Sequence, residues 1–285
     1  MVGAAAVIPV GYAVSRVSFL LALVVLWHWV RRYGSAEMAR IAVLLAAFNP
    51  VTPYFLAYRA ASLFFFLSTL SLWALSCRRW AMALLWGALA SLTRPTGILL
   101  AIPYAFAVLM ADGVPMARRM VRLLGGLAFA TGFIVVGGID RQVSGNAVAF
   151  LKFQAAWNRA AGFPFVAALR WLHHPGQALA VQGGWAFPLL AILFTAVGGL
   201  LALWMLKDRA LWPWAWYLGL VIILANSSNS FEGIPRFIAE LPPVYLGLAA
   251  LAEWQRWQYG ILMGVVGLFS LYAALWVLGV QAVQS

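Results

Sequence analysis

The stretch LLAILFTAVGGLLALWML, residues 189–206, decides the fold class because it is apolar almost throughout. A second run, GILMGVVGLFSLYAALWVLGV at residues 260–280, has the same character. About 20 such residues are needed for one helix to cross a bilayer. Lipid offers backbone groups no hydrogen-bond partners, so spanning segments are helices or closed barrels. Neither run shows the alternation of barrel strands. Both therefore predict transmembrane helices.

The composition extends this prediction to the whole chain of 285 residues. Hydrophobic residues make up 65% of it and charged residues only 9%, whereas soluble domains carry roughly 25% charged residues. A water-soluble surface cannot be covered with so few polar groups. We therefore predict one domain over residues 1–285, an all-α, polytopic transmembrane bundle of about ten spans. The predicted spans are 13–30, 41–57, 61–77, 80–93, 97–111, 121–139, 185–206, 211–226, 237–252 and 259–281.

Basic residues recur in every second link between these spans. They include Arg31 and Arg32, the pair Arg78 and Arg79, and Lys207. Short loops rich in Lys and Arg stay in the cytoplasm, so this alternation predicts the orientation of the bundle. The formal net charge of +12 is therefore a signal of membrane topology and of contact with lipid headgroups, and no nucleic-acid partner is predicted. Arg far exceeds Lys and Ala is abundant, which favours a GC-rich bacterium and hence its plasma membrane.

The predicted extracytoplasmic side carries the long loop 139–184, where aromatic and basic residues interleave as in a helix lying at the membrane interface. Cys77 is the sole cysteine, so no disulfide forms within the chain. His173 and His174 are adjacent, which suits a loop better than a pair of metal ligands. We predict no metal site and no cofactor, with a divalent cation left open as the alternative.

Four groups of polar residues fall at the extracytoplasmic ends of the predicted spans. Ionisable groups at membrane depth are costly and are functional candidates by default. The groups are Phe48-Asn49-Pro50 with Tyr58 and Ser62-Leu63-Phe64; Thr93-Arg94-Pro95-Thr96-Gly97; Ser144-Gly145 with Ala149-Phe150, Gln154, Trp157 and Arg159; and Pro235-Arg236-Phe237 with Pro242.

In the order and spacing of these four groups, residues 41–250 resemble the PIG-V type mannosyltransferases (GPI mannosyltransferase II) and their bacterial relatives. The resemblance implies a multi-spanning glycosyltransferase of the GT-C fold, with a polyprenyl-phosphate sugar, most often mannose, as the donor. It also implies roles in binding the donor for Asn49, Tyr58, Gln154 and Trp157. Two features depart from the family pattern: Ala61 stands where the family has an acid, and nothing before residue 13 matches the family's first luminal loop with its catalytic acid. We therefore expect the chain to be a relative that lacks this N-terminal part and is inactive by itself.

The chemistry of such a transfer selects further candidates. The leaving group is a phosphate, which favours cations at the site, and arginine binds phosphate through two parallel N–H groups. We therefore expect Arg94 and Arg236 to face one donor phosphate, with the Thr93 hydroxyl adding a hydrogen bond. The acceptor hydroxyl needs a base, for which Glu232 and Asp140 are the candidates.

Purely structural roles compete with each of these interpretations. Arg94 and Arg236 could anchor span ends at headgroups, and Asn49-Pro50 could simply end a span. The wider alternatives for function are a non-catalytic or degenerate membrane subunit that keeps the scaffold, working with a partner subunit, and a transporter. The transporter ranks last, because the sequence lacks paired broken helices and charges at the membrane midplane.

Overall fold

The computed structural model describes residues 4–149, 152, 162–174, 186–228, 230–231, 233–255, 260, 263–268 and 270–271. This described part is all-helical, as predicted. The first half contains α1 (Ala4–Val30), α2 (Ala36–Ala47), α3 (Thr52–Leu56), α4 (Ala61–Ser76), α5 (Trp80–Thr93), the 3-10 helix η1 (Pro95–Leu100) and α6 (Ala101–Leu109). The second half contains α7 (Met116–Gly125), η2 (Gly126–Ala130), α8 (Thr131–Ser144), α10 (Val166–His173), α12 (Ala186–Met205), η3 (Arg209–Leu211), α13 (Trp212–Ala225), α14 (Ile234–Ala239) and α15 (Pro242–Gln255).

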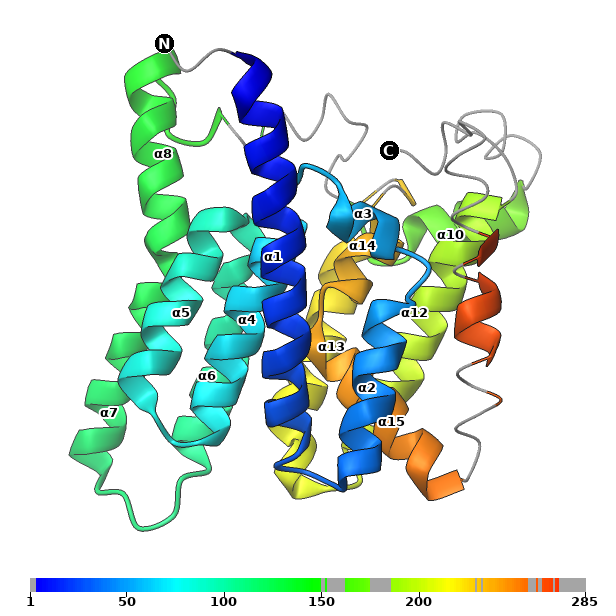
Figure 1. Cartoon of the computed structure of the whole chain (residues 1–285). Helices are drawn as coiled ribbons and strands as arrows, with labels where there is room; N and C mark the ends of the chain where they lie inside the picture. The colour runs from blue at the N-terminus through cyan, green and yellow to red at the C-terminus, as the bar shows by residue number, and fades with distance from the viewer. Residues whose placement is uncertain are drawn as a thin grey trace.

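The longer helices run roughly side by side, so that successive links alternate between two ends of the bundle (Figure 1). Three helical segments among the described residues are long and apolar enough to cross a membrane: Ile8–Val30, Met116–Ser144 and Pro188–Met205. Four further apolar helices are shorter, namely Ala61–Ser76, Trp80–Thr93, Pro95–Leu109 and Arg209–Ala225. Each of these seven segments overlaps a predicted span.

The predicted span 41–57 is wrong as a continuous helix. The helix α2 ends at Ala47, and α3 begins only at Thr52. Pro50 disfavours a helical conformation in the residue before it. Asn49 then stabilises the break, because its Oδ1 accepts a hydrogen bond from the Val51 N–H at 2.8 Å. A break at Leu241 likewise separates α14 from α15 where 237–252 was predicted as one span; there Pro242 and Pro243 follow the break.

The sixth predicted span is longer than expected. The helical segment begins at Met116 and continues through η2 to Ser144. It ends at Gly145, whose φ of 73° is a conformation that glycine adopts without strain. Asp140 therefore lies inside α8 and not in a loop, which corrects the predicted loop start at residue 139. The described part of that loop contains the short helix α10.

Aromatic side chains from distant helices fill the core between the segments. Phe19 of α1 stacks on Phe55 of α3 with ring centroids 5.2 Å apart. Trp29 of α1 meets Trp214 of α13 edge to face at 5.4 Å. Such pairs contribute roughly 0.5–1.5 kcal/mol beyond the area they bury. They fix α1 against both halves of the bundle.

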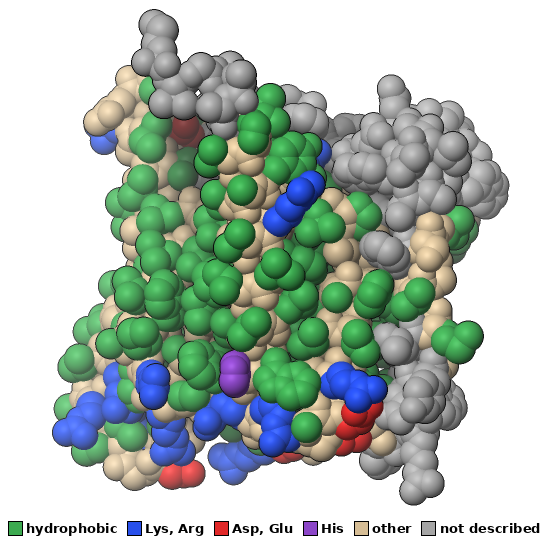
Figure 2. Space-filling model, in the orientation of Figure 1, with side chains coloured by type: hydrophobic (Ala, Val, Ile, Leu, Met, Phe, Trp, Pro, Cys, Tyr) green, Lys and Arg blue, Asp and Glu red, His purple; other side chains and the backbone are tan. Residues whose placement is uncertain are grey.

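The outer surface is apolar over a broad belt. Leu20, Ile134, Leu200 and Leu203 are each more than 60% exposed. Figure 2 shows hydrophobic side chains over most of the visible face, with most of the visible Lys and Arg gathered below the belt. Soluble monomers rarely expose contiguous apolar patches larger than a few hundred Å², so this surface suits contact with lipid.

Candidate functional site

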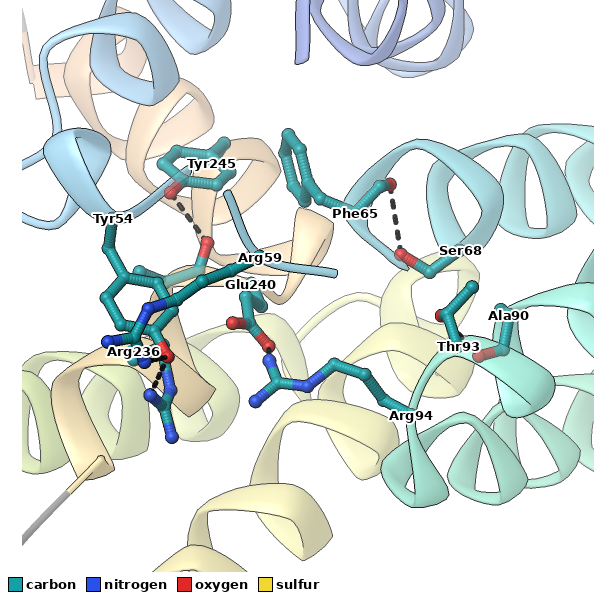
Figure 3. A network of polar contacts seen from close by, with 11 residues as sticks. Tyr54, Arg59, Phe65, Ser68, Ala90, Thr93, Arg94, Arg236, Glu240 and Tyr245 are labelled. Atoms are coloured by element: carbon teal, nitrogen blue, oxygen red, sulfur yellow. Dashed lines mark hydrogen bonds and ion pairs between the residues drawn. The ribbon is translucent and has the colours of Figure 1, made fainter. Parts of the chain in front are cut away.

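Three arginines from segments far apart in the sequence converge near α3 and α14. Arg59 lies in the link between α3 and α4, Arg94 ends α5, and Arg236 lies in α14. We call these three, together with Tyr54 and Glu240, the arginine cluster (Figure 3). The single link that joins the other ends of α4 and α5 carries Arg78 and Arg79, and α4 with its 16 residues is about 24 Å long. The cluster therefore lies at the end of the bundle opposite this basic link.

Tyr54 of α3 joins two of the arginines. Arg59 and Arg236 each donate a hydrogen bond to its hydroxyl oxygen. Their guanidinium carbons also lie over its ring, at 4.3 and 4.5 Å from the centroid. A cation over an aromatic face is attracted by the ring quadrupole. This attraction offsets part of the cost of burying Arg236, whose exposed fraction is only 8%.

Glu240 follows α14 directly and meets the third arginine. Its carboxylate forms an ion pair with the Arg94 guanidinium, across 146 positions of sequence. The glutamate side chain is 1% exposed and the arginine side chain 15%. Figure 3 shows the carboxylate between Arg94 on one side and Tyr54 with Arg236 on the other. The ion pair fixes the end of α5 against α14.

The ring of Phe237 brings Arg94 and Arg236 into one site. Both guanidinium carbons lie 5.3 Å from its centroid. Two groups that share one ring are neighbours, so the two guanidinium groups lie close to one another. A phosphate with several anionic oxygens can accept hydrogen bonds from two such planar forks at once.

Close backbone packing around the end of α5 fixes the position of Arg94. A Cβ built on Gly97 would come within 2.5 Å of the Ser91 backbone, so only glycine lets η1 fold back this closely on α5. Ser91 also accepts a hydrogen bond through its hydroxyl from the Gly132 N–H at 3.0 Å. Gly97 is therefore required for the close packing of the turn Thr93–Gly97, and Arg94 lies at the start of this turn.

The other candidates have more local partners. The Thr93 hydroxyl donates to the Ala90 carbonyl at 2.7 Å, the usual back-bonding of threonine within a helix. Asn49 is buried in the turn before α3, so its structural role there is established. Tyr58 is half exposed, and its ring lies 6.3 Å from that of Tyr12 in α1. These three neighbour the cluster in sequence, but their hydrogen bonds and ring contacts do not join them to its arginines.

Asp140 belongs to a different part of the bundle. It lies in α8, at one flank of the view in Figure 1, whereas α3 and α14 lie near the middle. The Ser144 hydroxyl donates to its backbone carbonyl at 2.8 Å. The remaining candidates, Glu232, Gln154 and Trp157, lie outside the described residues.

Tyr54, Arg59 and Glu240 were not selected as site residues from the sequence. The spacing in the sequence could have indicated that Glu240 lies near Arg236, because residues four positions apart lie on one face of a helix. The sequence does not distinguish Tyr54 from any other aromatic residue near a membrane interface.

A cavity of about 390 Å³ lies at the opposite end of the bundle. Its lining includes Tyr33, Trp204, Asp208 and Glu253. Both carboxylates have local partners: Asp208 accepts from the Ala210 N–H at 2.9 Å, and Glu253 accepts from the Ser35 hydroxyl. Ser35 also caps α2 by accepting from the Met38 N–H at 3.0 Å. These hydrogen bonds give Asp208 and Glu253 a structural role at helix ends.

In comparisons with protein-family models, with curated proteins and with solved structures, the chain matches none. Among the described residues, no group of three or more His, Cys, Asp or Glu side chains is placed to hold a metal ion.

Proposed function

We propose that this chain is a multi-pass membrane glycosyltransferase of the GT-C kind that takes its sugar, mannose in the first instance, from a polyprenyl-phosphate donor. In this proposal ten spans cross the plasma membrane of a bacterium, and the short basic links face the cytoplasm. The arginine cluster then lies on the extracytoplasmic side. The long link that follows α8 lies on that side too.

One observation carries the proposal: Arg94 and Arg236 share the Phe237 ring, next to Arg59 on Tyr54. Guanidinium groups stay charged at any relevant pH and match the geometry of a phosphate. A lipid phosphate is an anion that guanidinium groups bind, and it lies at the membrane edge, the depth at which this proposal places the cluster. As it becomes the leaving group, the same N–H donors stabilise the charge that develops on its oxygens.

A second candidate function is a donor-binding membrane subunit without catalysis. The observation in its favour is the ion pair of Glu240 with Arg94, because it engages a carboxylate that a general base would have to bring within reach of the acceptor hydroxyl. Glu240 is the one acid of the cluster as described. Such a subunit would bind the lipid-linked sugar and present it to a partner.

The proposal predicts selective binding of a phosphate-linked sugar. The full chain in nanodiscs is titrated with farnesyl-phosphate mannose and, as the matched control, with farnesyl mannoside, which lacks the phosphate. We expect the phosphate compound to bind at least about tenfold more tightly, a difference of about 1.4 kcal/mol. Equal affinities would contradict the proposal.

A parallel assay for mannose transfer to acceptors in native membranes separates the two candidate functions. Transfer that depends on the chain supports the enzyme. Selective binding of the phosphate compound without transfer supports the donor-binding subunit.

A further inference from the structure

One oxygen of the buried Glu240 carboxylate is left without a donor. Oε2 meets Arg94, whereas Oε1 is buried and has no hydrogen-bond partner among the described residues. An ionised carboxylate is only an acceptor, with room for about four hydrogen bonds. Leaving a buried charged acceptor unsatisfied is costly, so the site suits a ligand that brings a donor to this oxygen.

The surrounding elements hold the carboxylate in place. Glu240 directly follows α14, and its N–H donates to the Arg236 carbonyl at 3.0 Å. The Tyr245 hydroxyl of α15 donates to the neighbouring Ala239 carbonyl at 2.7 Å. The ion pair with Arg94 adds a third constraint. Oε1 is therefore a fixed acceptor within the arginine cluster.

The charges of the cluster determine which kind of ligand can bind beside Glu240 Oε1. The guanidinium groups attract an anion, but the carboxylate itself repels one. A ligand therefore fits best when its anionic part lies on the arginines and a neutral O–H lies on Glu240. A sugar joined to a phosphate has both groups within a few bonds, whereas a bare lipid phosphate has only the first.

We propose that Glu240 is a substrate-binding residue whose Oε1 accepts a hydrogen bond from a hydroxyl of the phosphate-linked sugar. This inference rests on the proposed function and assigns the selectivity of the same site. Glu240 lets the cluster hold a sugar-bearing lipid phosphate and discriminate against lipid phosphates without a sugar. A buried polar group that a competitor leaves unpaired is an effective basis for rejecting it.

The test compares two probes, farnesyl-phosphate mannose and farnesyl phosphate, on the full chain in nanodiscs. We expect the wild type to prefer the mannose compound by at least about tenfold, the size of effect that one charged hydrogen bond supplies. Glu240→Gln should lose most of this preference, because a neutral amide oxygen is a weaker acceptor. Glu253→Gln, at the other end of the bundle, is the matched control and should keep it.

A second measurement needs no variant and so does not depend on how Glu240→Gln folds. Farnesyl-phosphate mannose analogues that each lack one hydroxyl are titrated against the wild type. We expect one analogue to lose most of the preference over farnesyl phosphate. If every analogue binds like the parent compound, Glu240 does not contact the sugar and the inference is overturned, while the binding of phosphate stands. If neither parent probe binds, the proposed function itself fails and the inference falls with it.

Discussion

Replacing Arg94 or Arg236 by lysine is expected to weaken the binding of farnesyl-phosphate mannose by about 10- to 100-fold. A hydrogen bond to a charged group contributes about 1.5–3 kcal/mol, and every 1.4 kcal/mol is tenfold in affinity. Lysine keeps the charge but replaces the planar fork with a point charge. It therefore loses the second of two parallel hydrogen bonds to the phosphate.

Lysine is the informative substitution because the fold should tolerate it. Arg94 neutralises Glu240, which is 1% exposed. Removing that cation leaves an uncompensated buried charge and destabilises a protein by roughly 3–5 kcal/mol. Arg94→Ala would therefore confound the loss of binding with unfolding, whereas Arg94→Lys retains an ammonium beside the carboxylate.

Arg118→Lys is the matched control. Arg118 is exposed on α7, at the basic end of the bundle. Its substitution should leave the dissociation constant unchanged. If Arg94→Lys and Arg236→Lys also bind with wild-type affinity, the two arginines are membrane anchors and not a phosphate site.

The second large effect is expected at Gly132, where α8 passes close to α5. A Cβ at this position would lie 1.9 Å from the Ser91 carbonyl oxygen, which is backbone and cannot turn aside. We expect Gly132→Ala to destabilise the protein by at least about 1–3 kcal/mol, the usual cost of overpacking. Thermal unfolding followed by tryptophan fluorescence measures the effect.

Gly138→Ala is the control in the same helix. No atom lies within 4 Å of a Cβ built there, so the substitution should leave stability unchanged or raise it by up to about 1 kcal/mol through helix propensity. Ser91 lies one turn before Arg94. Gly132→Ala should therefore also weaken donor binding, whereas Gly138→Ala should not. Equal stability of the two variants would show that the close approach of α5 and α8 is not required.

The helices of this chain follow from its sequence to a large extent. The helices α4, α5 and α13 agree with predicted spans to within a few residues, because long apolar runs bounded by charges leave few other folds in lipid. The prediction failed at Asn49-Pro50 and at Pro242-Pro243. Apolar composition continues through both sites, but proline interrupts the backbone hydrogen bonding that a helix requires.

The site was only partly predictable. The ends of predicted spans placed Arg94 and Arg236 on one side of the membrane, and the structure brings them to one ring. The pairing of Arg94 with Glu240 could not be read from a single sequence. It joins positions 146 apart, and it depends on the way α5 and α14 pack in three dimensions.

The central claim is that the arginine cluster holds the phosphate of a lipid-linked sugar. The most direct test is the paramagnetic broadening of the phosphorus resonance of farnesyl-phosphate mannose by a spin label on the full chain, with Cys77→Ser removing the native thiol. A label at Tyr58→Cys lies beside Arg59, and a label at Met116→Cys lies at the opposite end of the bundle; both native side chains are exposed. We predict strong broadening from position 58 and little from position 116. Equal broadening from both labels, or broadening from position 116 alone, would contradict the claim.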